Sequence, residues 1–160
     1  MTFFGKNARI TATGKSGEAI KASERSLIRR IMMNSNGLLI NITSRSISGS
    51  CGDIEIAVVS FEGRARIESS NFGDLQEELQ SLVNQGRVRM VVDFTNVLYI
   101  SAAGLGVLCG VCRQTRDLDG DIKFINMSFR IRNLFDMLGF SRLFNIHEDE
   151  ESAVNAFREA

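Results

Sequence analysis

The sequence predicts an α/β domain in which helices pack on a single mixed β-sheet, and three observations support this fold class. From residue 37 onward, segments with strand alternation are separated by segments with the apolar spacing of helices. The continuous apolar run Met90, Val91 and Val92 is typical of a strand buried on both faces of a helix-covered sheet. The chain has 160 residues, of which 44% are hydrophobic, which is enough for one core. The predicted order of elements is ββαβαβαβα.

The first strands are predicted at residues 38–43 and 54–61, joined by the turn-rich segment 48–53, so they form an antiparallel pair. A helix follows, with four apolar residues at helical spacing: Leu75, Leu79, Leu82 and Val83. Gly86 can end this helix in a left-handed conformation, and residues 87–94 form the next strand.

The second helix is predicted to begin near Ala102, and a turn at residues 117–120 leads into a strand at 121–127. Ser128 is placed to cap a third helix, which Gly139 ends.

The last strand is predicted at residues 143–146, and a short helix follows it. Residues 148–151 are all acidic, and carboxylates are favoured where a helix begins, so we interpret this cluster as a helix start rather than a metal site. We interpret His147, beside the cluster, as an exposed helix-cap histidine.

Residues 1–36 are predicted to be a basic N-terminal extension to the domain at residues 37–160. They contain seven Lys or Arg residues against two Glu residues. We expect either a frayed arm or a short basic helix laid on the domain, with one apolar side formed by Ile20, Leu27, Ile28, Ile31 and Met32. The apolar stripe is short and has no aromatic residue, which disfavours a membrane-surface helix.

Charge and cysteine content restrict the partners and the cellular location that we expect for the protein. Nineteen basic and nineteen acidic residues leave no net charge, which argues against general nucleic-acid binding. No apolar run is long enough to span a bilayer, and residues 1–9 do not resemble a secretory signal. Three cysteines at uneven spacing fit reduced thiols. We therefore expect a cytoplasmic protein.

Motifs that would indicate catalysis are incomplete. Residues 14–16, Gly-Lys-Ser, lack the preceding glycine of a phosphate-binding loop. Cys109 and Cys112 have the spacing of a redox pair, but they come about two turns into a helix, where small buried core thiols are expected. His147 could act as a general base only beside a nucleophile, and the sequence has no nucleophile motif. Residues 104–106 lack the third glycine of a dinucleotide fingerprint. The sequence predicts no enzyme, no cofactor and no metal.

The most informative segment is the turn into the second helix, residues 99–106. Small residues there leave the helix start open, and a helix N-terminus presents unpaired backbone N–H groups with a partial positive charge. Such a turn suits an anion, a phosphorylated hydroxyl or a carboxylate of a partner. We expect a contact surface formed by these residues: Tyr99, Ser101, Ala102, Ala103, Gly104, Leu105 and Gly106.

Residues 96–108, Asn-Val-Leu-Tyr-Ile-Ser-Ala-Ala-Gly-Leu-Gly-Val-Leu, resemble the signature of STAS domains, the anti-sigma factor antagonists of bacteria. Residues 61–64 and 133–144 are similar to the glycine turn of the family and to its third helix and last strand, so the resemblance covers residues 38–160. It implies a STAS-like fold and a protein partner, a serine kinase that doubles as the anti-sigma factor. In antagonists of this kind, the first serine of an Asp-Ser-Ser/Thr-Gly motif is phosphorylated, and phosphorylation breaks the complex.

The chain departs from this pattern at the switch itself. Ser101 occupies the position of the usual aspartate and Ala102 that of the phosphoacceptor, while Arg66 stands where the family commonly has an aspartate. Because alanine cannot carry phosphate, regulation at the standard position is excluded. Ser101 is either the N-cap of the helix, which we favour, or a phosphoacceptor shifted by one residue.

These observations favour a non-enzymatic module that docks residues 99–106, with Arg66 nearby, onto an anti-sigma factor of serine kinase type or a larger signalling assembly. The alternative is a STAS-like cytoplasmic subunit of a lipid or anion transport system, which would also need no phosphoacceptor. A thiol redox module on Cys109 and Cys112 is the least favoured hypothesis. The sequence does not identify the partner, and it leaves open whether the chain forms a homodimer.

Overall fold

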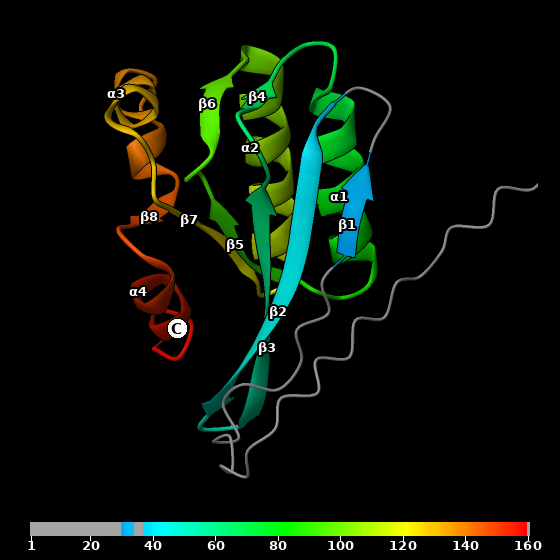
Figure 1. Cartoon of the computed structure of the whole chain (residues 1–160). Coiled ribbons are helices and arrows are strands. Elements are labelled where there is room, and N and C mark those ends of the chain that lie inside the picture. Colours follow the sequence, from blue (N-terminus) through cyan, green and yellow to red (C-terminus); the bar gives the residue numbers. More distant parts are fainter. Residues whose placement is uncertain (1–29, 34–36, 160) are drawn as a thin grey trace, which may run out of the picture.

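The computed structural model describes residues 30–33 and 37–159, and its main element is a six-stranded mixed sheet (Figure 1). In sheet order, the strands are β1 (Arg30–Met33), β2 (Leu39–Gly49), β3 (Gly52–Phe61), β5 (Arg89–Asp93), β7 (Asp121–Ile125) and β8 (Asn145–His147). β2 pairs antiparallel with both β1 and β3, and β3, β5, β7 and β8 run parallel. The predicted α/β class with a mixed sheet is confirmed.

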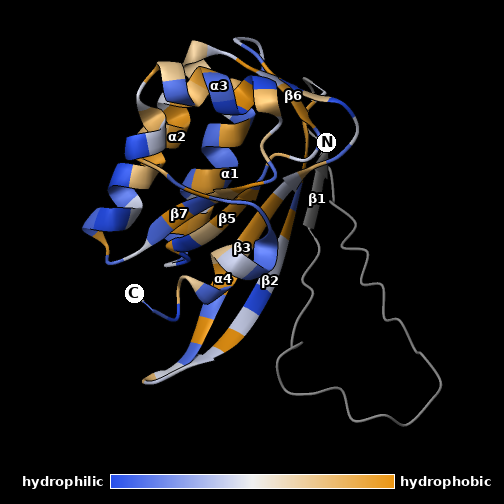
Figure 2. Ribbon diagram, turned by 90° about the vertical axis from the view of Figure 1, so that its left-hand side faces the viewer, coloured by the Kyte–Doolittle hydropathy of each residue, from blue (hydrophilic) through white to orange (hydrophobic). Residues whose placement is uncertain are grey.

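In the described part of the chain, four α-helices cover the two faces of the sheet: α1 (Phe72–Asn84), α2 (Ala102–Asp117), α3 (Phe129–Met137) and α4 (Glu150–Asn155). A short 3₁₀ helix, η1 (Phe140–Arg142), follows α3. Buried side chains of α1, α2 and α3 share the larger core with one face of the sheet, whereas Ala153 of α4 and Phe157 pack on the other face. The middle of the central strand β5 is hydrophobic in Figure 2, as expected for a strand with helices on both sides.

The predicted limits of the helices follow from local chemistry. The side chain of Ser128 caps α3, since its Oγ accepts a hydrogen bond from the backbone N–H of Ile131 at 3.4 Å. Gly86 and Gly139 adopt φ angles of +76° and +74° just after α1 and α3, a conformation that favours glycine. These assignments are confirmed.

A second, two-stranded parallel sheet goes beyond the predicted elements. It pairs β4 (Ala65–Ile67) with β6 (Val97–Ile100) and lies beside the start of α2 (Figure 1). Strands of three and four residues are too short to show a clear period in the sequence. The pairing of β4 with β6 holds two loops together, and the two strands form one surface next to the predicted contact residues.

The predicted helix near the N-terminus is wrong at Ile31 and Met32, which lie in strand β1. Residues Arg30 to Met33 pair antiparallel with Ile42 to Leu39, so the sheet begins before the predicted domain boundary at residue 36. The apolar stripe is too short to stabilise a helix, and these four residues instead form a strand that pairs with β2. The other residues of that expected helix, Ile20, Leu27 and Ile28, lie outside the described residues, as does the Gly-Lys-Ser segment.

The C-terminal region needs a smaller correction. Leu143 follows η1, the last strand is Asn145–His147, and His147 is therefore a strand residue rather than a helix cap. The N-cap of α4 is Asp149, whose Oδ1 accepts a hydrogen bond from the N–H of Ser152 at 2.8 Å. The interpretation of the acidic cluster as a helix start is confirmed. Within the described ranges, no helix is long and apolar enough to cross a membrane.

Candidate docking site at the start of helix α2

The chain enters α2 through a turn that is held on both sides. The N–H of Ser101 donates to the carbonyl of Ile67 in β4 at 2.8 Å, which ties the turn to the small sheet. The Oγ of Ser101 accepts from the N–H of Gly104 at 3.2 Å, and its carbonyl accepts from Leu105 at 3.0 Å. The predicted N-cap role of Ser101 is confirmed, and the residue is only 8% exposed.

Two asparagines that the sequence does not single out hold the loops around this turn. The side chain of Asn71 donates to the carbonyl of Arg66 and accepts from the N–H of Glu68, both at 2.8 Å. Asn96 donates from Nδ2 to the carbonyl of Phe61 at 2.8 Å. Asparagine is common in turns because its side chain can replace backbone partners, but sequence alone does not say which backbone groups it will meet.

Tyr99 and Arg66 lie side by side on the surface of the small sheet. They are register partners of β6 and β4, and the guanidinium carbon of Arg66 lies 4.9 Å from the centre of the Tyr99 ring. Arg66 also donates from Nε to Glu68 at 2.6 Å. Both side chains remain exposed, Tyr99 at 44%, so they present a rigid aromatic and charged surface beside α2.

The remaining predicted contact residues divide by burial. Ala102 and Gly106 are exposed and Ala103 is half-buried, whereas Gly104 and Leu105 are buried under the small sheet. A Cβ atom on Gly104 would lie 2.7 Å from Cγ2 of Ile67, while one on Gly106 would meet no atom within 4 Å. Gly104 is therefore needed for packing, and Gly106 leaves the outer side of the helix flat.

The thiols lie further along α2 and in the core. Cys112 is buried, as predicted, and Cys109 is half-buried against the core. Burial raises the pKa of both thiols, which disfavours the reactive thiolate. Among the described residues, no three His, Cys, Asp or Glu side chains form a cluster that could hold a metal ion.

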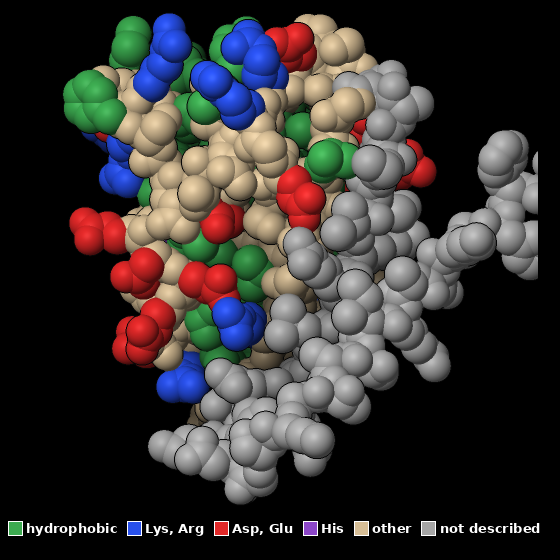
Figure 3. Space-filling view, in the orientation of Figure 1, with side chains coloured by type: hydrophobic (Ala, Val, Ile, Leu, Met, Phe, Trp, Pro, Cys, Tyr) green, Lys and Arg blue, Asp and Glu red, His purple; other side chains and the backbone are tan. Residues whose placement is uncertain are grey.

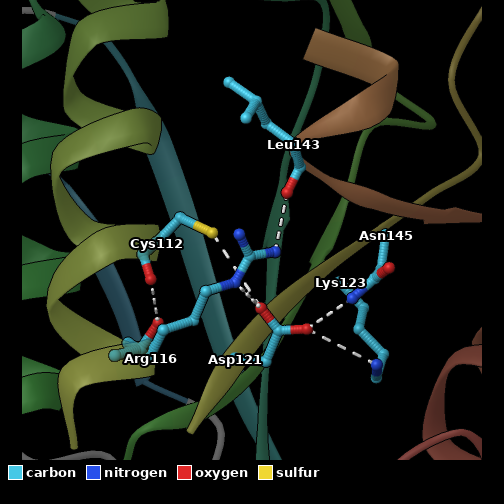
Figure 4. Close-up of polar contacts among 7 residues, drawn as sticks. Cys112, Arg116, Asp121, Lys123, Leu143 and Asn145 are labelled. Carbon is cyan, nitrogen blue, oxygen red and sulfur yellow. Dashed lines mark hydrogen bonds and ion pairs between the residues drawn. The ribbon is translucent and has the colours of Figure 1, made fainter.

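A polar cluster around Asp121 fixes the other end of α2 (Figure 4). Its carboxylate accepts hydrogen bonds from Arg116 of α2 at 2.9 Å and from Asn145 of β8 at 2.6 Å, and it lies 3.6 Å from Nζ of the buried Lys123. Arg116 also donates to the carbonyl of Leu143 at 2.7 Å. The cluster joins α2 to β7 and β8. It therefore fixes the helix at the end opposite to the candidate site.

Charge is distributed unevenly over the face drawn in Figure 3. Lys and Arg side chains gather at the upper end, over α3 and the small sheet, and Asp and Glu side chains gather at the lower left, over α4. The candidate site lies at the upper, more basic end. Arg66 contributes to this character.

Comparisons with known proteins identify a family for this chain. The STAS domain family model matches residues 54–153. A protein of Bordetella bronchiseptica, BtrV, described as a candidate anti-sigma factor antagonist, is 33% identical over 94 residues, which is 59% of this chain and 81% of BtrV. The anti-sigma-B factor antagonist of Bacillus subtilis is 31% identical over 80 residues, covering 50% of this chain and 72% of that protein.

Solved structures show the same fold at lower identity. An anti-sigma factor antagonist from Mycobacterium paratuberculosis matches with a TM-score of 0.58 at 18% identity, covering 73% of this chain and 94% of that one. The anti-sigma factor antagonist SpoIIAA in its unphosphorylated form matches with a TM-score of 0.54 at 13% identity, covering 82% and 99%. At these identities, the similarity supports the fold alone.

Proposed function

Because this chain belongs to the STAS domain family, we propose that it is a non-enzymatic regulatory module that binds an anti-sigma factor of serine kinase type through the start of α2. The observation that carries the proposal is the exposed surface formed by Tyr99, Arg66, Ala102 and Gly106, in a chain whose curated relatives are named anti-sigma factor antagonists. A rigid aromatic residue beside small, flat positions is a suitable centre for a protein contact.

We further propose that binding does not depend on phosphorylation of this turn. SpoIIAA is known in unphosphorylated and phosphorylated forms, but Ala102 of this chain has no hydroxyl to modify. The hydroxyl of Ser101 is buried and is engaged with Gly104 as the helix cap. A kinase would have to open the start of α2 to reach it, which supports the structural role over that of a shifted phosphoacceptor.

Replacing Ser101 with alanine separates these two roles. As a cap residue, Ser101 stabilises the helix start, so the variant is expected to lose about 1 kcal/mol of unfolding free energy in urea denaturation. If Ser101 is not phosphorylated, the wild type and the variant isolated from native cells should migrate equally in a gel that retards phosphorylated proteins. A mobility shift that disappears in the variant, with unchanged stability, would establish phosphorylation and contradict the proposal.

Gly106→Trp tests the docking surface. Gly106 is chosen over Ala103 because Ala103 is half-buried, whereas Gly106 is exposed and has open space around it. A tryptophan there should leave the fold intact and prevent close approach, so affinity for the kinase is expected to fall at least about 30-fold. The measurement is isothermal titration with the kinase that wild-type protein retains from native lysate, identified by mass spectrometry and produced pure.

Leu118→Trp is the matched control, because Leu118 is exposed at the opposite end of the same helix. It should bind the kinase like the wild type. Equal binding by the Gly106 variant would show that the start of α2 is not the contact. Recovery of a permease or an ABC ATPase in place of a kinase would favour the transport-subunit alternative, which is less supported because the curated relatives are named antagonists.

A cytoplasmic location and the absence of catalysis belong to the same proposal. Anti-sigma factors act on transcription, so a partner of this class would be met in the cytoplasm. Fractionation of native cells tests the location, and a cytoplasmic pool that contains the kinase complex is the expected result.

A further inference from the structure

Exposed large hydrophobic side chains are concentrated in one region of this molecule. In residues 37–159, seven such side chains are exposed, and five of them lie on β6 or on α3 and its C-terminal cap: Leu98, Tyr99, Phe129, Met137 and Leu138. Leu118 ends α2, and Leu143 lies beside Arg116 in the C-terminal half of α2. Single exposed apolar residues are ordinary, but a group of this kind marks an interaction surface.

The centre of the region is a stripe along the outer face of α3. Phe129 is 82% exposed and Met137 is 85% exposed, and the exposed Asn133 lies between them. The three residues are spaced i, i+4 and i+8, so they lie one above the other on one side of the helix. In Figure 3, hydrophobic and basic side chains lie next to each other at the upper left, over α3.

Two charged residues run along one flank of this stripe. Arg132 and Asp136 are about half exposed, and Nε of Arg132 lies 3.7 Å from Oδ1 of Asp136. The positive charge is closer to the N-terminal end of α3, and the negative charge is closer to its C-terminal end.

We propose that the outer face of α3 binds the same face of a second copy of this chain, with the two helices antiparallel about a two-fold axis. This arrangement would place Phe129 of each copy against Met137 of the other, with the two Asn133 side chains near the axis. Because a two-fold axis reverses the helix direction but keeps each flank on its own side, Arg132 would face Asp136 of the other copy.

The order of residues on α3 is what favours a second copy as the occupant. The stripe is apolar at both ends and polar in the middle, and its flank is positive at one end and negative at the other, so it complements its own reversed copy. The chain carries no net charge, so copies do not repel each other as a whole. A uniformly anionic surface, such as a lipid bilayer, would pair with the exposed Arg130 and Arg132 but would leave Asp136 facing like charge, whereas a reversed copy pairs Arg132 with Asp136.

The size of the face sets the expected strength. A nine-residue helix is roughly 13 Å long. Even with Leu98 and Leu138 contributing at its borders, such a contact is smaller than the roughly 800 Å² per partner of a standard interface. We therefore expect a weak dimer, with a dissociation constant on the order of 10–100 µM.

Sedimentation velocity of the full chain from about 1 µM to about 500 µM tests the proposal. The wild type should shift from monomer to dimer over this range. Phe129→Ser combined with Met137→Ser should raise the dissociation constant at least about 30-fold, because it removes the apolar ends of the face. Leu118→Ser removes an exposed apolar residue outside the region and should dimerise like the wild type. Circular dichroism checks that each variant is folded.

A charge exchange tests the antiparallel geometry. Arg132→Asp alone should weaken the dimer about 10-fold, because it sets two carboxylates against each other. Arg132→Asp with Asp136→Arg should return the dissociation constant to within about 3-fold of the wild type. A wild type that stays monomeric would overturn the proposal, as would a dimer that Phe129→Ser with Met137→Ser leaves unchanged. A monomer that sediments with phosphatidylglycerol vesicles through Phe129 would assign the face to lipid instead.

Discussion

Replacing Gly104 with valine is expected to lower the free energy of unfolding by about 3 kcal/mol. The missing side chain of Gly104 is what lets α2 pack closely against β4 and β6. A Cβ atom would lie 2.7 Å from Cγ2 of Ile67 and 3.0 Å from Cγ1 of Ile100, and both isoleucines are buried. Branched carbon atoms in this space would push the helix start away from the small sheet, a strain that typically costs about 1–3 kcal/mol or slightly more.

Gly106→Val provides the control on the same helix. A Cβ atom on Gly106 would have no neighbour within 4 Å, so valine there changes helix propensity without causing a clash. Urea denaturation should show this variant within about 0.5 kcal/mol of the wild type. Equal stability of the two valine variants would mean that the small sheet does not pack on α2 as closely as described.

The elements with strong local chemistry can be predicted from sequence. Ser128 and Ser101 each precede a helix and cap it with the side-chain oxygen, and Gly86 ends α1 in a left-handed conformation. These assignments need only neighbours in the chain, because a cap or a turn is a local structure. The central strand around Val91 is equally clear, because burial on both faces requires an unbroken apolar run.

Elements that depend on distant pairing cannot be predicted in the same way. Strand β1 exists through its pairing with β2, and β4 through its pairing with β6, so the short segments carry little periodicity of their own. The acidic cluster after His147 favours a helix cap at this residue, yet pairing with β7 extends the strand through it. In these segments, pairing with a distant strand determines the secondary structure, and the local sequence preference does not.

The sequence locates the candidate site but not its exposed surface. The small residues indicate the start of α2, while burial divides them into Gly104 and Leu105 in the core and Ala102 and Gly106 on the surface. The contact of Tyr99 with Arg66 depends on the parallel pairing of β6 with β4, which brings together residues far apart in the chain. Periodicity carries no signal for such a pair.

Asp121→Ala is expected to destabilise the fold by about 3 kcal/mol, because it leaves a buried ammonium group without its carboxylate. Lys123 is 5% exposed, and its Nζ lies 3.6 Å from the carboxylate of Asp121 and 4.5 Å from the ring centre of Phe157. Breaking a buried ion pair from one side usually costs about 3–5 kcal/mol, since the remaining charge stays desolvated. The same change removes the acceptor of Arg116 and Asn145, so urea denaturation should show the full loss.

Lys123→Met removes the other member of the pair and should cost no more than about 1 kcal/mol, because an apolar chain of similar length fills the space beside Phe157. Asp121 keeps Arg116 and Asn145 as partners in this variant. If the cost of Asp121→Ala arises from the stranded ammonium, adding Lys123→Met to it should recover part of the loss. A double variant as unstable as the sum of the two single variants would contradict this explanation.

The same lysine also acts on His147. Burial, and then the nearby charge of Lys123, lower the pKa of His147 below its ordinary value. The unfolded chain therefore takes up a proton at His147 more readily than the folded one, so this group should reduce the stability of the wild type as the pH falls below about 6.5. In Lys123→Met the pKa of His147 should rise, and the loss of stability at acid pH should become smaller. Titration of the single histidine by NMR measures the first effect, and an unchanged pKa would show that the charge of Lys123 does not act on the ring.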